Sequence, residues 1–365
     1  MPCFLWRESC ILSRMTTTTR AQEFLERVHR FLAGEDRRPI LSVCHQQRYR
    51  QMEDEDEMVK VACEVLHEDI ADGVPLPTFL ADFGTVSTAA LFGGAIVPAN
   101  PDSGAMKYIH PVTDDVAEVL AMTPRRFEES DFQKGLDLYR RVCATLGSEA
   151  PDGVFLRTPD FQGALNTLSL VVNQTELMVA MVERPEVVKA ALNHIVDILI
   201  AYYKRFYAEA GKGRVLGNIW PFIVLQEQYG VVLTEDYMPL LGAEHYEEFG
   251  LPPLKRVSDA FGGVHAHCCG NYRQHLKAMR ASGVKYLGLE VYYPERMEDV
   301  YATFGDSVYL VPGLTAVGQR EFGSVAALIR SWKGMPHARG RYWIPWCYEW
   351  GDVDDLRNAI AEVLQ

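Results

Sequence analysis

The chain has 365 residues, a formal net charge of −13 at pH 7 and 48% hydrophobic residues. This length suits one large barrel or two ordinary domains, and the composition is that of a globular protein rather than a disordered one. The acidic balance and the lack of a Lys/Arg run argue against a nucleic-acid-binding surface. No apolar stretch approaches the roughly 20 residues that span a bilayer, so we expect no membrane segment.

Eight cysteines are scattered along the chain without the dense, regular spacing of a secreted disulfide scaffold. We therefore expect a protein of the reducing cytoplasm. The first residues are apolar, but Arg7, Glu8 and Arg14 interrupt them, which does not fit the core of a signal peptide. We predict a flexible extension over residues 1–20, with Met15 as an alternative start, and one domain over residues 21–365.

The first predicted elements are a helix over residues 21–32, which Gly34 ends, and a short strand over residues 39–43. A polar segment, CHQQRYR, follows this strand directly, where barrel enzymes place substrate groups. Gln46 and Arg48 are therefore candidates for binding a substrate carboxylate. A solvated loop, with Arg48 in a surface salt bridge, is the alternative.

A second apolar run over residues 77–94 breaks at Asp82. A carboxylate at the end of a buried strand either caps the next helix or faces the pocket, and both remain open for Asp82. An acidic helix is predicted over residues 53–72 and another helix over residues 132–146. Residues 95–126 show no clear period and are predicted to pass over the barrel.

From Gly153 onward, apolar strands alternate regularly with helices. The predicted strands are GVFLRT, RVLGNIW, GVVLTE, GVHAHCC, VKYLGLE, VYLVPG and RYWIPWC, and the helices cover 174–210, 243–260, 271–282, 294–304 and 319–334. Strands separated by helices imply parallel βαβ units. With the two earlier strands there are nine candidates, one more than a barrel needs, so one is miscalled or lies outside it. We predict a single (β/α)8 TIM-type barrel with an N-terminal helical extension; a doubly wound open sheet is the alternative.

The segment GGVHAHCCGN, residues 262–271, holds a concentration of metal-ligand side chains. If residues 263–269 form a strand, His267 and Cys269 point to one face and Cys268 to the other. Imidazole and thiolate are ligands that zinc prefers. The alternative is that the cysteines pack in the core, as free cysteines often do. His265, on the same face as His267 but deeper, is predicted to be a core histidine.

Further ligands are predicted at the ends of other strands. Glu290 ends VKYLGLE and Cys347 ends RYWIPWC, and barrel enzymes gather their chemistry at the carboxyl ends of the strands. We therefore expect both to converge with His267 and Cys269 on a zinc ion. Asp236 follows GVVLTE, where it would orient substrate or hydrogen-bond a zinc-bound histidine. A helix cap for residues 237–241 is the alternative for Asp236.

Three segments resemble the uroporphyrinogen decarboxylase superfamily, and specifically its zinc-dependent, cobalamin-linked methyltransferase branch. They are the block over residues 236–254, HCCGN, and VPGLTAVGQREFG, and the resemblance covers most of residues 35–365. It implies a zinc site formed by His267, Cys269 and Cys347, with an acidic fourth ligand at Glu290.

The resemblance also implies an activity. The enzyme would move a methyl group between a corrinoid, such as methylcobalamin, and a thiol or another small acceptor or donor. No DxHxxG-type corrinoid-binding run occurs, so the corrinoid is expected on a partner protein or free. The direction of transfer stays open. Gln46 and Arg48 would then hold a corrinoid side chain or a substrate carboxylate.

The chain departs from both branches of the superfamily. Trp346 and Tyr348 flank Cys347 where the methyltransferase branch has small residues, and they either shape a substrate pocket or pack. The decarboxylase branch has an arginine-rich segment after the first strand, from which CHQQRYR departs, and an Asp after the next strand, which Asp82 resembles. A metal-independent tetrapyrrole decarboxylase is therefore the alternative function. Asp82 and Asp236 are the candidate catalytic residues.

Overall fold

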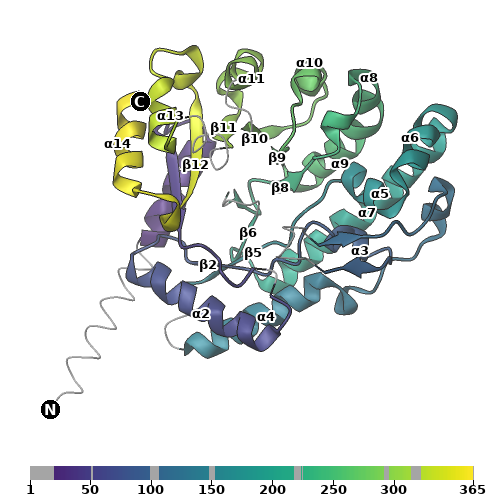
Figure 1. Cartoon of the computed structure of the whole chain (residues 1–365), viewed down its shortest axis with the longest axis horizontal. Helices are drawn as coiled ribbons and strands as arrows, with labels where there is room; N and C mark the ends of the chain where they lie inside the picture. The colour runs from purple at the N-terminus through teal and green to yellow at the C-terminus, as the bar shows by residue number, and fades with distance from the viewer. Residues whose placement is uncertain are drawn as a thin grey trace.

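The structure is a computed structural model that describes residues 20–50, 52–98, 107–147, 153–217, 223, 225–291, 296–313 and 322–364. It is an α/β fold in which parallel strands curl around an interior and helices cover their outer side (Figure 1). The predicted extension over residues 1–20 lies outside the described residues except for Arg20, which begins a described helical segment over 20–32. Residues 314–321 of the VPGLTAVGQREFG segment also lie outside them.

Two sheets contain the predicted strands. The larger is wholly parallel, in the order β1 (Ile40–Cys44), β12 (Arg341–Cys347), β11 (Tyr309–Pro312), β10 (Tyr286–Val291), β9 (Val264–His267) and β8 (Val231–Thr234). The smaller has the order β2 (Thr78–Leu80), β5 (Phe155–Arg157), β6 (Val215–Gly217) and β7 (Leu225–Gln226), with β7 antiparallel to β6. All nine candidate strands are therefore strands, and β7 is an additional one.

The two sheets share one interior. Apolar side chains from both, including Phe155 of β5, Val232 of β8 and Trp343 of β12, form a single buried cluster. At one junction, a Cβ on Gly217 of β6 would lie 3.1 Å from the side chain of Val232, and Gln162 forms a parallel bridge to Thr234 of β8. A second, larger cluster fills the space between strands and helices. The sheet is therefore curled around a packed core.

The helices follow the predicted pattern with some changes of boundary. They are α2 (Glu55–Ala71), α3 (Ser87–Ala90), α4 (Asp131–Leu146), α5 (Ala164–Val171), α6 (Gln174–Glu183), α7 (Pro185–Ala210), α8 (Ala243–His245), α9 (Leu251–Phe261), α10 (Leu276–Ala281), α11 (Met297–Phe304), α13 (Val325–Ser331) and α14 (Val353–Val363). The helix predicted over 174–210 is two helices. Arg184 leaves the helical conformation (φ −137°, ψ 52°) because Pro185, the first residue of α7, disfavours it there. None of the described helices is long and apolar enough to cross a membrane.

The described residues of the segment over 95–126 form short local elements. They include the antiparallel pair β3 (Ile96–Val97) and β4 (Tyr108–Ile109), followed by a 3-10 helix over Val116–Ala121. Asp115 begins that helix by accepting a hydrogen bond from the backbone N–H of Ala117 at 3.0 Å. The hairpin and the 3-10 helix were not predicted, because neither has the length that produces a visible period.

A glycine makes room for large rings in the interior. Tyr309 of β11 stacks on His265 of β9 with ring centroids 5.4 Å apart, and both side chains are fully buried. Gly288 of β10 lies between them in the sheet. A Cβ there would clash with the Tyr309 ring and would lie 2.6 Å from His265 Nδ1. His265 is thus a core histidine, as predicted, and burial lowers its pKa well below the usual value.

We predict that Gly288→Ala destabilises the protein by about 1–3 kcal/mol, because the added methyl group overfills a closely packed layer. Denaturant unfolding of the variant and the wild type measures this difference. Gly242→Ala is the control, since no atom lies within 4 Å of a Cβ at that position. The free energy of unfolding of Gly242→Ala falls by less than about 1 kcal/mol, which is the cost of an alanine at a helix N-cap. Equal stability of Gly288→Ala and wild type would contradict the packing described.

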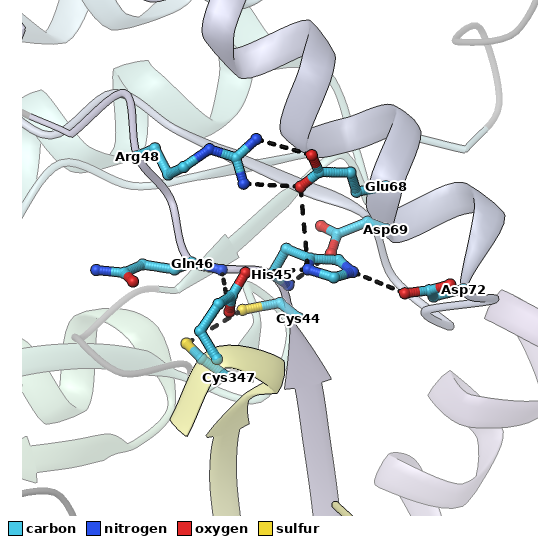
Figure 2. A network of polar contacts seen from close by, with 9 residues as sticks. Cys44, His45, Gln46, Arg48, Glu68, Asp69, Asp72 and Cys347 are labelled. Atoms are coloured by element: carbon cyan, nitrogen blue, oxygen red, sulfur yellow. Dashed lines mark hydrogen bonds and ion pairs between the residues drawn. The ribbon is translucent and has the colours of Figure 1, made fainter. Parts of the chain in front are cut away.

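The first and last strands of the larger sheet meet along a continuous parallel pairing. Partners run from Ile40 and Trp343 to Cys44 and Cys347. The sulfur atoms of Cys44 and Cys347 lie 3.8 Å apart at the end of this pairing (Figure 2). Trp343 also donates a hydrogen bond from Nε1 to Ser42 at 2.9 Å. This pairing joins segments that are about 300 residues apart in the sequence.

His45, the first residue after β1, ties this pairing to α2. Its Nε2 lies 2.8 Å from Asp72 Oδ2, its Nδ1 lies 3.1 Å from Glu349 Oε1, and its backbone N–H donates to Asp69 at 2.7 Å (Figure 2). The ring also packs on Tyr348 with centroids 4.7 Å apart. Partial burial opposes a charge on the imidazole, but the hydrogen bonds to Asp72 and Glu349 outweigh it and raise the pKa of His45.

We predict that His45→Gln lowers the free energy of unfolding by less than about 1 kcal/mol, because solvent screens these contacts. The charged imidazole meets its carboxylates only in the folded protein. Its contribution is therefore fully present below the unfolded-state pKa of about 6.5 and is lost as pH rises through the higher folded-state pKa. Denaturant unfolding at pH 5.5 and pH 9 measures the change.

The exposed His110 supplies the control for this prediction, since His110→Gln removes an imidazole without removing such contacts. The groups that face His45 are Glu68, Asp69, Asp72, Tyr348 and Glu349. A loss in His45→Gln that is equal at both pH values would show that packing, rather than charge, stabilises this junction.

Candidate metal centre

The candidate metal centre lies just beyond the carboxyl ends of β8 and β9. β9 ends at His267, so the strand predicted to continue to Cys269 is two residues shorter than expected. Even so, Cys268 is buried in the core between strands and helices, whereas Cys269 is exposed. The two cysteines therefore still point to opposite sides, as in a strand, although β9 ends before them.

Three side chains form a group with metal-ligand geometry. The group consists of Asp236, His267 and Cys269. A carboxylate oxygen, an imidazole nitrogen and the thiol sulfur of these residues lie within 4.8 Å of one another. Asp236 Oδ1 lies 3.6 Å from His267 Nε2 and accepts a hydrogen bond from the backbone N–H of Cys269 at 2.8 Å. Asp236 therefore holds the cysteine loop in place and faces the imidazole at the same time.

Glu290 lies on the other side of the imidazole. It is the penultimate residue of β10, is 3% exposed, and its carboxylate is hydrogen-bonded to His267 Nδ1. Burial disfavours a charge on the ring, but the Glu290 carboxylate outweighs burial and raises the pKa of His267 well above its usual range. A carboxylate on Nδ1 fixes which ring nitrogen is left for a metal, here Nε2. Glu290 therefore occupies the place of an orienting partner in this structure, not of a member of the three-residue group.

The surroundings of Asp236 do not show the helix cap considered for it. The 3-10 helix Met238–Leu240 has no side-chain cap, and Asn166 Oδ1 instead accepts a hydrogen bond from the backbone N–H of Tyr237 at 2.9 Å. The preceding Glu235 is turned away into the core, where burial raises its pKa to about 8. Asp236 alone of this acidic pair faces the imidazole.

Cys347, the predicted ligand from the last strand, lies elsewhere. It is fully buried in the interior cluster and its sulfur faces Cys44. Among the described residues it is not part of the group formed by Asp236, His267 and Cys269. Burial and the neighbouring Cys347 thiol raise the pKa of Cys44 well above its usual value.

The two polar candidates after β1 are engaged at the surface. Arg48 forms two hydrogen bonds of 2.8 Å with Glu68, the salt bridge considered as its alternative role (Figure 2). Gln46 donates its backbone N–H to Glu349 at 2.8 Å, and its side chain is exposed. Neither contacts the three-residue group in the structure.

The aromatic candidates beside Cys347 pack against other rings. Trp346 is 3% exposed and lies edge-on to Trp350, with centroids 5.6 Å apart. Tyr348 packs on His45, as described above. Both aromatic side chains therefore contribute to packing at the junction of the first and last strands.

Asp82 does not cap the next helix, since α3 has Val86 at its N-cap and no side-chain cap there. Its Oδ1 accepts a hydrogen bond from the backbone N–H of Gly84 at 2.7 Å, which is a local turn cap. Its Oδ2 accepts from Arg50 Nε at 2.6 Å, and the carboxylate is 7% exposed. This ion pair also links the loops after β1 and β2, which are not paired as strands.

A further acid, Asp160, lies close to this centre but was not identified from the sequence. It accepts hydrogen bonds from Gln162 at 2.6 Å and from Thr234 at 3.1 Å, and Thr234 is the register partner of His267. Burial raises the pKa of Asp160 to about 6, although Gln162 and His267 favour its charged form. Its place two residues after the strand GVFLRT is the signal that could have identified it, by the rule of strand ends applied to Asp82.

These residues fit zinc in donor type and in accessibility. Carboxylate, imidazole and thiolate are all zinc ligands, and Cys269 is exposed, so a substrate can reach the metal from the solvent side. Glu290 supplies the hydrogen bond that metal-binding histidines characteristically make through their second nitrogen.

Comparisons with known proteins agree with this architecture. Residues 53–311 match the family model described as Uroporphyrinogen decarboxylase (URO-D). A methyltransferase from Methanosarcina mazei has a similar structure, with a TM-score of 0.61 and 14% sequence identity over 92% of this chain and 97% of that chain. At this identity the likeness shows a shared fold. No curated protein matches the sequence significantly. Since the family match covers more than half of the chain, this protein belongs to the uroporphyrinogen decarboxylase family.

Proposed function

We propose that the protein is a zinc-dependent methyltransferase of the cobalamin-linked branch of its family. It would move a methyl group between a corrinoid and a thiol or another small molecule. The observation that carries this proposal is the group of Asp236, His267 and Cys269, whose ligand atoms lie within 4.8 Å of one another. The similar fold of a methyltransferase supports the class of reaction.

In this proposal His267 Nε2, Cys269 Sγ and Asp236 hold the zinc ion, and Glu290 orients His267. Bound zinc would lower the pKa of a substrate thiol and so provide a nucleophile at neutral pH. The fourth position is left for the substrate. Cys347, which the family resemblance implies as a ligand, stays a prediction, because its thiol faces Cys44 in the structure.

The residues of the chain fix the geometry of the centre before any substrate arrives. Glu290 holds the imidazole from Nδ1, and Asp236 holds the Cys269 loop through its backbone N–H. Such prearranged ligands lose little conformational entropy when the substrate binds. Because Cys269 is exposed whereas Glu290 is buried, the substrate approaches from the cysteine side.

The proposal also takes the two sheets as one closed TIM-type barrel, whose nine parallel strands are one more than the predicted (β/α)8 barrel has. Three contacts support closure: the packing of Gly217 against Val232, the ion pair of Arg50 with Asp82, and the hydrogen bond from Leu80 N–H to Tyr49 Oη at 3.1 Å. In such a barrel the centre lies at the carboxyl-end mouth, where this fold places its chemistry. Asp82 and Asp160 would then line the same mouth.

The corrinoid is proposed as a co-substrate, free or carried by a partner protein in the cytoplasm. When a thiol is methylated, the sulfur–carbon bond forms and the carbon–cobalt bond breaks with its electron pair left on cobalt. The thiol proton is released. The reverse transfer, from a methylated substrate to the corrinoid, uses the same centre.

We predict that the purified protein holds about one zinc ion per chain, as expected for a single catalytic site. Cys269→Ser and His267→Ala lose this zinc, because each removes a ligand. Glu290→Gln retains it with about 10- to 100-fold weaker affinity, the usual cost of removing an orienting partner. Metal analysis after dialysis against a graded series of chelator concentrations measures these differences.

Cys268→Ala is the matched control, since it removes a neighbouring thiol that faces the core. It retains zinc at wild-type affinity. The same measurement on Cys347→Ser tests the ligand implied by the family resemblance. A native protein without zinc, still able to turn over its substrate, would contradict the proposed centre.

We predict that the wild-type protein demethylates methylcobalamin when a suitable thiol is supplied, and that His267→Ala lowers kcat at least about 100-fold. The change in the corrinoid absorption spectrum follows the reaction across a panel of thiols. Release of carbon dioxide from a porphyrinogen, with no spectral change for any thiol, would instead identify the metal-independent decarboxylase. In that case Asp82→Asn, rather than His267→Ala, abolishes activity.

A further inference from the structure

A groove runs along the outer side of the sheet next to the candidate metal centre. α10 and α11 lie side by side (Figure 1), and a cavity of about 520 Å³ opens between them. Arg273 and Leu276 of its lining also border a narrow gap of about 10 Å³ beside Gly270 and Asn271. Gly270 directly follows Cys269, so the groove lies next to the loop of the candidate zinc ligand.

The groove is positively charged, unlike the protein as a whole. Its described lining contains four cations and one acid, Asp299, which is a local excess of three positive charges in a chain of net charge −13. The cations are Arg273, Lys277, Arg280 and Arg296. Asp299 is shared between two of them, at 2.9 Å from Arg273 and 3.8 Å from Arg296.

Two of these cations have no acidic partner among the residues that the structure describes. Lys277 and Arg280 form no ion pair with any residue that the structure describes, although Arg280 lies 5.9 Å from the centre of the Phe304 ring. Both side chains are exposed on α10 and both line the larger cavity. Charges of one sign gathered in a groove attract a ligand of the opposite sign.

The shape and chemistry of the groove fit a phosphate group on an organic arm. Arg and Lys are the side chains that bind phosphate oxygens, by charge-assisted hydrogen bonds. Leu276, Ala281 and Ala302 provide an apolar lining beside the cations. The volume lies within the range of small-molecule sites.

The co-substrate of the proposed reaction carries such a group. A complete cobalamin has a nucleotide arm joined to the corrin ring through a phosphodiester, which holds one negative charge. We propose that the groove between α10 and α11 binds this phosphodiester through Lys277 and Arg280, with Arg273 and Arg296 nearer the metal centre. This inference rests on the proposed function and names how the corrinoid is held.

Equilibrium binding of two corrinoids tests the groove directly. Methylcobalamin carries the phosphodiester, whereas methylcobinamide lacks the nucleotide arm and the phosphodiester linkage that joins it to the ring. We expect the double variant Lys277→Gln/Arg280→Gln to bind methylcobalamin about three- to tenfold more weakly, the effect of two exposed charge contacts. Its dissociation constant for methylcobinamide stays at the wild-type value. Added inorganic phosphate, at constant ionic strength, weakens only methylcobalamin binding.

The matched control is Lys212→Gln/Lys333→Gln, which removes two exposed positive charges elsewhere. It binds both corrinoids as the wild type does. Unchanged methylcobalamin binding in the groove variant, or an equal loss for both corrinoids, would overturn the assignment. Zinc content and thiol methylation are measured on the same wild-type sample. If both are as proposed but the groove variant binds methylcobalamin normally, the groove assignment is wrong and the proposed function stands. If the wild type binds neither corrinoid, the inference falls.

Discussion

The pairing of three parallel strands positions the candidate metal centre. Thr234 of β8 is the register partner of His267 at the end of β9, and Asp236 follows Thr234 by two residues, so it reaches the same level as the Cys269 loop. β10 pairs with β9 on the other side and brings Glu290 to the opposite nitrogen of the imidazole. A slip of one residue in either pairing would turn a carboxylate to the other face of the sheet. The orientation of the imidazole is thus a consequence of strand register, which is rigid, rather than of loop conformation.

The charges gathered at this point explain why a metal suits it. Asp236 and Glu290 flank one imidazole, and Cys269 adds a third group that becomes negative on losing its proton. Buried or half-buried charges persist in proteins when they are paired or coordinate a metal. Without a metal, a proton on His267 provides the balancing charge, and Glu290 favours that protonated ring. A divalent cation at Nε2 would replace the proton on that nitrogen and would also pair with the Cys269 thiolate, whereas a single proton on the ring balances only one of these charges.

Sequence patterns identified the part of the centre that depends on short-range geometry. Side-chain alternation separated Cys269 from Cys268, and the rule of strand ends located Glu290 and Asp236, because both depend only on strand periodicity and on the parallel arrangement. The rule of strand ends could not tell which of these two carboxylates faces the metal and which orients the imidazole. Asp236 faces the Nε2 side of the ring and Glu290 the Nδ1 side, which depends on how β8 and β10 flank β9. Cys347 also ends a strand, but that strand pairs with β1, and the Cys44 thiol meets it first. Strand ends alone do not say which strands are neighbours.

The electrostatic character of the sheet changes along its order of strands. At the junction of β1 and β12, carboxylates surround His45, which holds that end of the sheet together. Two strands along, beyond β11, the segment that follows β9 leads to the groove that contains Lys277 and Arg280. An anionic group that approaches the sheet is therefore repelled by the acidic junction and attracted to the side where Cys269 is exposed. Long-range attraction of this kind acts over about 8 Å at physiological ionic strength. An anionic group on a ligand is therefore attracted toward the exposed Cys269 loop before it makes any contact there.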